Sequence, residues 1–118
     1  MKNRPRVLSA SSVSGDKVVN PQGEKLGEIE EIMLDIDDDR IAYAVLSFGG
    51  FLGIGDKLFA VPWGALKLDP KNKRFILDVP KAKLEKAPGF DKNNWPDFAD
   101  RTFGEQIYDY YATERYWL

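Results

Sequence analysis

A glycine-rich stretch stands out among the residues that could do chemistry, with the sequence SFGGFLGIGDKLFAVPW at positions 47–63. Glycines followed by lysine can cradle a phosphate, provided that Lys and then Ser or Thr follow the last Gly directly. Here Asp56 separates Gly55 from Lys57, and Leu58 follows the lysine. A dinucleotide fingerprint fails too, because a strand and not a helix is expected after the glycines. The stretch therefore predicts a hairpin connection, with glycines taking positive φ.

The tip of this glycine loop is apolar. Phe51, Leu52 and Ile54 lie between the glycines. Three apolar side chains at a loop tip either fold back over the end of a barrel or face a partner. Both interpretations stay open, and the three residues are candidates for an interface.

An acidic cluster offers a second kind of chemistry. Asp35, Asp37 and Asp39 have the opening spacing of a calcium-binding loop. Arg40 stands where that loop requires Gly, and Leu46 stands where it requires a bidentate Glu. We expect a solvated hairpin turn, with a weak cation site at these three aspartates as the alternative.

The chain has neither Cys nor His. This composition excludes disulfides, thiol nucleophiles, Cys/His zinc sites and imidazole acid–base chemistry. Many carboxylates are present, but their spacing singles out no catalytic pair. The net charge of −2 argues against binding nucleic acid through a broad positive field. We expect no enzyme activity and no cofactor.

Strands must position these residues. Residues 26–36 fit either a helical stripe or a strand, and a bulge near Glu30 and Glu31 would bring Ile29 into phase with the strand. Turn signals at 21–23 and 37–39 favour the strand. Further strands are expected at 40–48, 57–63, 65–69 and 74–79, with Pro62 indicating an edge or a bulge. With the segment near Asp16 or Val18, where order is expected to begin, this makes six short strands in about sixty residues, which indicate a small β-barrel or sandwich.

The character of the chain changes after Val79. A short helix is expected at 80–87, and Thr102 and Glu105 have the spacing of a capping box. The predicted organisation is a flexible arm at 1–15, a β-barrel at 16–80 and a helical, aromatic extension at 81–118. The extension either packs on its own barrel or clasps a partner, and we favour an interface formed by five of its aromatic residues, Trp95, Phe98, Tyr111, Tyr116 and Trp117.

No apolar run approaches the length of a membrane-spanning helix, and the first residues lack the apolar core of a signal peptide. We therefore expect a cytoplasmic protein without an integral membrane segment.

Three motifs carry a resemblance to a known family. They are the turn Gly23, Leu26, Gly27, the acidic turn that leads into the strand at 37–43, and the strand ending Val61-Pro62-Trp63. With these motifs, residues 18–79 resemble a PRC-barrel domain, and the aromatic extension resembles that of stand-alone bacterial members. The family includes the cytoplasmic part of the photosynthetic reaction-centre H subunit and the C-terminal domain of a ribosome maturation factor.

The resemblance implies a six-stranded β-barrel that serves protein contact and assembly, with no catalytic residues to carry over. The chain lacks the transmembrane helix of the H subunit and the preceding barrel of the ribosome factor. Together these observations predict a non-enzymatic, homodimeric interaction module of a bacterial cytoplasm. Two alternatives are a peripheral component of a membrane photosynthetic or electron-transfer complex, and a small-ligand or cation-binding protein.

Overall fold

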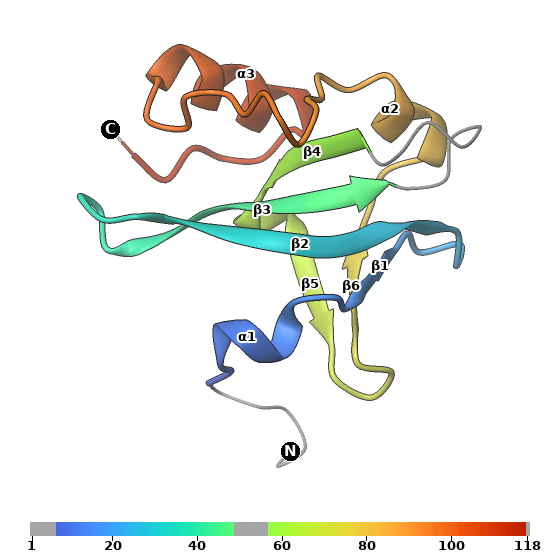
Figure 1. Ribbon diagram of the computed structural model, residues 1–118. Helices are drawn as coiled ribbons and strands as arrows, with labels where there is room; N and C mark the ends of the chain where they lie inside the picture. The colour runs from blue at the N-terminus through green and yellow to red at the C-terminus, as the bar shows by residue number, and fades with distance from the viewer. Residues whose placement is uncertain (1–6, 49–56, 118) are drawn as a thin grey trace.

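The computed structural model describes residues 7–48 and 57–117 (Figure 1). Within these residues, six strands and four helical segments follow one another. In order they are α1 (Ala10–Val13), β1 (Lys17–Val19), β2 (Lys25–Asp35), β3 (Arg40–Phe48), β4 (Lys57–Pro62), the 3-10 helix η1 (Trp63–Ala65), β5 (Leu66–Asp69), β6 (Arg74–Leu77), α2 (Lys81–Glu85) and α3 (Arg101–Tyr110).

All six strands belong to one sheet with the order β4-β3-β2-β1-β6-β5. Every neighbouring pair is antiparallel except β1 and β6, which run parallel. Figure 1 shows the sheet curling, so that β5 and β6 cross the direction of β2 and β3. This confirms the predicted mainly-β, six-stranded architecture. Pro62 ends β4 at the edge of the sheet, as its missing N–H requires.

The segment at 26–36, whose sequence fits either a helix or a strand, is a strand, because β2 spans Lys25–Asp35. β2 pairs with β1 and β3 along its length, and its register with β3 shifts between Ile29 and Glu31, which confirms the predicted bulge. Ile29, just before this shift, is 2% exposed. Leu26 is 0% exposed and lies at a separate irregularity, where the register of β2 with β1 shifts between Gly27 and Lys25.

The core lies between the curled sheet and the C-terminal extension. Phe59 and Leu46 from the sheet and Ile107 from α3 are completely buried, and all belong to one apolar cluster. The Tyr108 hydroxyl donates a hydrogen bond of 2.5 Å to the carbonyl oxygen of Ala42 in β3. Figure 1 shows α3 lying across one face of the sheet. The extension therefore packs on its own chain.

Part of the predicted N-terminal arm packs on the sheet in the structure, through helix α1 and the residues that follow it. Val13, at the end of α1, is 4% exposed and belongs to the core. The Gly15 N–H donates to the Ile29 carbonyl at 2.8 Å, which fixes the entry to β1. The predicted boundaries near residues 15 and 80 stay predictions.

Helix α3 begins two residues earlier than the predicted capping box. Its cap is Asp100, whose carboxylate accepts a hydrogen bond from the Thr102 N–H at 2.9 Å. The prediction that Thr102 is the cap is wrong, because an Asp two residues earlier satisfies the same unpaired donors of the first turn.

Candidate binding site

The hairpin between β2 and β3 extends beyond the rest of the sheet and is held at its end by one carboxylate. Asp35 Oδ1 accepts hydrogen bonds from the N–H groups of Asp37 at 3.1 Å and Asp38 at 3.2 Å. Asp39 completes the turn with a φ of 55°, a conformation that Asp tolerates better than most residues. The acidic residues thus serve the turn, as the sequence predicts.

This hairpin presents two aliphatic side chains to solvent. Leu34 is 68% exposed and Ile36 is 82% exposed. Alternation along the strand puts them on one side of the chain and Asp35 on the other. The sequence pattern assigns Leu34 and Ile36 to a core face together with Ile32. The structure leaves them uncovered because the hairpin continues past the sheet that would bury them.

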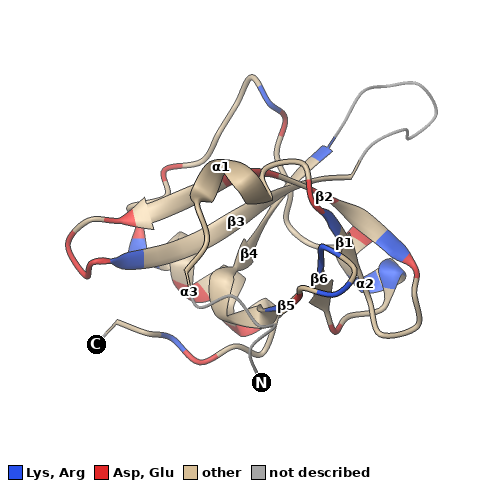
Figure 2. Cartoon of the chain, turned by 90° about the horizontal axis from the view of Figure 1, so that it is seen from below, with Lys and Arg blue, Asp and Glu red and all other residues tan. Residues whose placement is uncertain are grey.

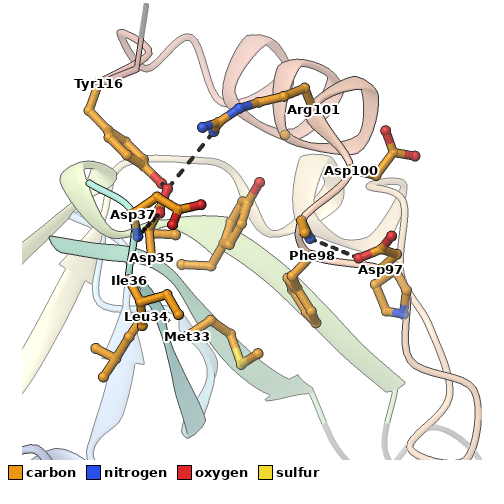
Figure 3. Close-up of a pocket in the computed structure, with 15 residues that line it drawn as sticks. Met33, Leu34, Asp35, Ile36, Asp37, Asp97, Phe98, Asp100, Arg101 and Tyr116 are labelled. Carbon is orange, nitrogen blue, oxygen red and sulfur yellow. Dashed lines mark hydrogen bonds and ion pairs between the residues drawn. The ribbon is translucent and has the colours of Figure 1, made fainter. Parts of the chain in front are cut away.

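A recess lies between this hairpin and the segment that leads into α3 (Figure 3). Its volume is about 420 Å³. Its walls combine apolar side chains with four aspartates and one arginine, and we call it the acidic recess. The lining residues are Met33, Leu34, Asp35, Ile36, Asp37, Ala42, Tyr43, Pro96, Asp97, Phe98, Ala99, Asp100, Arg101, Gly104 and Tyr116.

A polar network closes one end of the acidic recess. The Tyr116 hydroxyl donates to Asp35 Oδ2 at 2.5 Å, across 81 positions of sequence. Arg101 lies 3.9 Å from Asp35 and 3.6 Å from Asp38, and its guanidinium stacks 4.9 Å from the ring centroid of Trp117. Figure 3 shows Tyr116 and Arg101 converging on Asp35 from the C-terminal side. Hairpin, helix and tail are therefore linked at this point.

The contacts of this network shift the pKa values of Asp35 and Tyr116. The hydrogen bond from Tyr116 is the main cause that lowers the pKa of Asp35, with further hydrogen bonds and Arg101 acting in the same direction against burial. Burial, followed by the bond to Asp35, raises the pKa of Tyr116. Asp35 is therefore an anion and Tyr116 a neutral donor at neutral pH.

Tyr43 contributes a second phenol to the wall. The residue is only 3% exposed, and its ring packs against Phe98 and Phe103 at centroid distances of 5.4 and 5.9 Å. Its hydroxyl lies against Gly104, where an added Cβ would come within 2.8 Å. Burial raises the pKa of Tyr43 to about 12. Within the described residues, this hydroxyl makes no hydrogen bond.

The predicted site residues fall into three groups. Asp35 and Asp37 line the acidic recess while Asp39 does not, and no group of three acidic residues in the described chain is arranged to hold a metal ion. Phe51, Leu52 and Ile54 lie outside the described residues. Of the aromatic candidates, Phe98 and Tyr116 line the acidic recess.

The remaining three aromatic candidates differ in what surface they leave. Trp95 is 38% exposed beside Phe90 and Phe98. Trp117 is partly buried against Tyr108 at a centroid distance of 4.9 Å. Tyr111 is 7% exposed and belongs to the core, so its ring is covered by its own chain.

Sequence reasoning missed four important residues of this site, namely Leu34, Ile36, Tyr43 and Arg101. The only available signal was the run Leu34-Asp35-Ile36-Asp37, in which apolar and acidic residues alternate next to a turn. Nothing local indicates that Tyr43 and Arg101 meet there, because they come from β3 and from the start of α3.

Comparison with known proteins identifies the barrel. The family model for the PRC-barrel domain matches residues 5–84. The chain belongs to the PRC-barrel family. The matched part of this PRC-barrel protein supplies the β2–β3 hairpin, and the extension beyond it supplies Phe98, Arg101 and Tyr116. The acidic recess is thus formed jointly by the family domain and by residues that the family model does not cover.

Among solved structures, the chain is similar to the 16S ribosomal RNA processing protein RimM of Pseudomonas aeruginosa. The identity is 15% and the TM-score is 0.44, and the match covers 70% of this chain and 49% of RimM. The chain thus spans about half the length of that relative. A search of curated proteins finds no match. No helix within residues 7–48 and 57–117 is long and apolar enough to cross a membrane.

Proposed function

We propose that this PRC-barrel protein is a non-enzymatic interaction and assembly module that forms a homodimer through the β2–β3 hairpin and the acidic recess. The observation that carries the proposal is the exposure of Leu34 and Ile36 at the rim of a recess with an aromatic wall. Apolar side chains that border a concave, partly aromatic surface are typical of protein interfaces. The contact and assembly roles implied by the family support the same function.

The ionisation of the site argues against catalysis. A carboxylate whose pKa is lowered, as in Asp35, is a weak general base at neutral pH. Tyr43, with a pKa of about 12, exchanges its proton poorly near neutrality. Both groups are better suited to hold a fixed charge and a fixed hydrogen bond than to transfer protons.

Apolar burial alone does not account for a stable dimer. Fully burying one Leu or Ile side chain contributes about 1.5–3 kcal/mol. Association costs on the order of 4–15 kcal/mol in lost translational and rotational freedom. The aliphatic pair therefore needs further contacts, for which the acidic recess and the apolar glycine-loop tip are the candidates. The predicted alternatives, a membrane-complex component and a ligand-binding protein, stay predictions.

Solution mass by light scattering across a concentration series tests the proposal. We expect the full chain to be dimeric and the double variant Leu34→Ser/Ile36→Ser to be monomeric at the same concentrations. The matched control is Lys67→Ser/Lys71→Ser, which alters two exposed residues on the β5–β6 hairpin and should remain dimeric. A full chain that is monomeric throughout, or a Leu34→Ser/Ile36→Ser variant that stays dimeric, would contradict the proposal.

A further inference from the structure

The acidic recess carries more negative than positive charge, which favours binding of a cation. Its one arginine, Arg101, is already engaged with Asp35, Asp38 and Trp117. Asp97 and Asp100 each use a carboxylate oxygen to accept one backbone N–H, from Ala99 and Thr102. The side chain of Asp37 makes no hydrogen bond or ion pair with another described residue. Negative charge is thus in excess over the positive charge that the described walls supply.

An unpaired hydroxyl at the wall of the acidic recess gives an independent indication of a ligand. The Tyr43 hydroxyl is in the wall of the acidic recess and has no hydrogen-bonding partner among the described residues. Among the described residues, the side-chain oxygen that is sealed from solvent without a partner is the Tyr111 hydroxyl; the Tyr43 hydroxyl instead opens onto the acidic recess, where it is available to a group that enters. A protonated phenol can accept a hydrogen bond from an ammonium or guanidinium group. The recess therefore suits a basic side chain, with apolar neighbours that pack on Leu34 and Ile36.

The start of α3 does not reverse this preference. A helix N-terminus favours anions, but the Asp100 carboxylate already occupies that position as the cap. A second anion would also meet Asp97, Asp37 and Asp35 in the same recess.

The chain itself contains a segment with the required chemistry. Residues 1–8, MKNRPRVL, carry Lys2, Arg4 and Arg6, and the first acidic residue of the chain is Asp16. The basic residues are followed by Val7 and Leu8, which are 89% and 45% exposed. Basic and aliphatic residues thus adjoin in the segment, as acidic and aliphatic residues adjoin at the recess.

The geometry favours a recess on another copy. Figure 1 shows α1, and with it the start of the described chain, on the side of the sheet opposite to α3. The first turn of α3 forms part of the acidic recess. The sheet therefore lies between the base of the segment and the recess of the same copy. Figure 2 shows the acidic residues of the β2–β3 turn, coloured red, at an outer end of the molecule, where a second copy can approach.

We propose that residues 1–8 of one copy bind in the acidic recess of a second copy, so that a symmetric dimer contains two identical contacts. The basic side chains meet Asp37 and Asp97, one of them donates to the Tyr43 hydroxyl, and Val7 and Leu8 pack on Leu34 and Ile36. This inference rests on the proposed function and names the contacts that complete the dimer. Isologous contacts of this kind close at two copies.

Charge reversal in full chains tests the inference. We expect Arg4→Glu/Arg6→Glu and Asp37→Lys/Asp97→Lys each to raise the dimer dissociation constant on the order of tenfold or more, because each places like charges together. Mixing the two variants should restore the dimer. In the mixed dimer, one contact joins a native segment to a native recess, and the other joins a segment with Glu to a recess with Lys, so both contacts pair opposite charges. The control Asp78→Lys/Asp91→Lys makes the same charge change at exposed positions away from the recess and should leave the dimer unchanged.

Each result of the mixing experiment has a definite meaning. A restored dimer supports the inference, provided that both variants melt as folded proteins. A wild-type dimer with a mixture that stays monomeric overturns the inference and leaves the interaction module in place. A wild-type chain that is monomeric at every concentration overturns both. If a synthetic peptide of residues 1–8 binds Arg4→Glu/Arg6→Glu but not the monomeric wild type, the segment occupies its own recess, and the contact between copies is wrong.

Two further measurements do not depend on how the reversed chains fold. The dissociation constant of the wild-type dimer should rise with added salt, because salt screens the exposed charges. Tyr43→Phe should weaken the dimer several-fold without lowering the free energy of unfolding of the monomer, measured at concentrations below the dissociation constant, since the hydroxyl has no partner in the described chain. A salt-independent dimer, or a Tyr43→Phe dimer of unchanged affinity, would overturn the ionic contact or the role of the hydroxyl, respectively.

Discussion

At the scale of single residues, the molecule depends on hydrogen bonds that join distant parts of the sequence. Tyr116 and Asp35 are the clearest case, because one donor fixes both the tail and the charged state of the hairpin. Arg40 adds to the same contact by stacking 4.7 Å from the centre of the Tyr116 ring. Tyr110 makes a comparable bond to a neutral acceptor, the Lys83 carbonyl, at 2.6 Å.

Removing the Tyr116 hydroxyl should destabilise the protein in a way that depends on pH. Hydrogen bonds to a charged group contribute about 1.5–3 kcal/mol, so we expect Tyr116→Phe to lower the free energy of unfolding by that amount at neutral pH. The folded pKa of Asp35 lies below its ordinary value of 3.8. Its contribution is therefore complete above the unfolded pKa and is lost as pH falls through the folded pKa.

Urea denaturation at neutral and at acid pH checks this prediction. The difference between wild type and Tyr116→Phe should shrink in acid, whereas the difference for the control Tyr110→Phe should not, because its acceptor is a carbonyl oxygen. A Tyr116→Phe difference that is the same at both pH values would show that Asp35 is not the group that the hydroxyl stabilises.

Sequence alone could name several of these residues but not their association. Asp35 was a candidate for a cation site, and Phe98 and Tyr116 were candidates for an interface. The structure brings all three into one recess. They meet because α3 and the tail lie across the sheet. Local sequence patterns do not reveal this, since Asp35 and Tyr116 are 81 positions apart.

At the scale of elements, the β-sheet requires a close approach at Gly27. This residue has a φ of 147°, and a Cβ added there would lie 2.5 Å from the backbone oxygen of Ser47 in β3. Gly23, in the turn before β2, has a φ of 88° with open space around it. Glycine is thus required at the two positions of this motif for different reasons. Gly23 adopts a positive φ in a turn, and Gly27 lets β2 approach β3 closely.

Alanine substitutions should separate these two reasons. We expect Gly23→Ala to cost about 1–2 kcal/mol, the ordinary penalty for a side chain at positive φ. Gly27→Ala should cost about 3 kcal/mol or more, because two strands must also move apart. Thermal and urea unfolding of the two variants measures both values. Equal losses at the two positions would mean that the approach to Ser47 relaxes without cost.

Local signals predicted the elements well where turns delimit them. The turn at 21–23 and the acidic residues at 37–39 defined β2 correctly, and the bulge followed from the phase of Ile29. The cap of α3 was misplaced because Asp100 and Thr102 both have suitable side chains, and only the geometry of the preceding loop selects Asp100. The exposure of Leu34 and Ile36 could not be predicted, since alternation does not reveal where a sheet ends.

At the scale of the whole molecule, the C-terminal extension completes the core. Ile107 and Tyr108 of α3 are 0% and 2% exposed, and Leu58 in β4 forms a bridge with Phe90 of the extension. The barrel without the extension would present Tyr43, Leu58 and their neighbours to solvent. The extension therefore stabilises the family domain whether or not it also contacts a second copy.

A chain ending at Ala87 should consequently aggregate or lose cooperative unfolding. The apolar surface uncovered on the sheet is the physical cause. Light scattering and a thermal melt of the truncated chain check this, with the full chain carrying Ile107→Ala as an intermediate case that should fold but lose about 2–5 kcal/mol. A truncated chain that is soluble and melts cooperatively would show that the barrel is self-sufficient.

The parallel pair of β1 and β6 has a consequence for how the chain folds. Lys17 pairs with Arg74, so the sheet cannot join its two halves until nearly two-thirds of the chain has been synthesised. Pairing across such a separation requires a large loop to close first, and contacts of this kind slow folding. During translation, the β2–β3–β4 meander can form early from neighbouring segments, whereas β1 waits with one edge unpaired until β6 emerges from the ribosome.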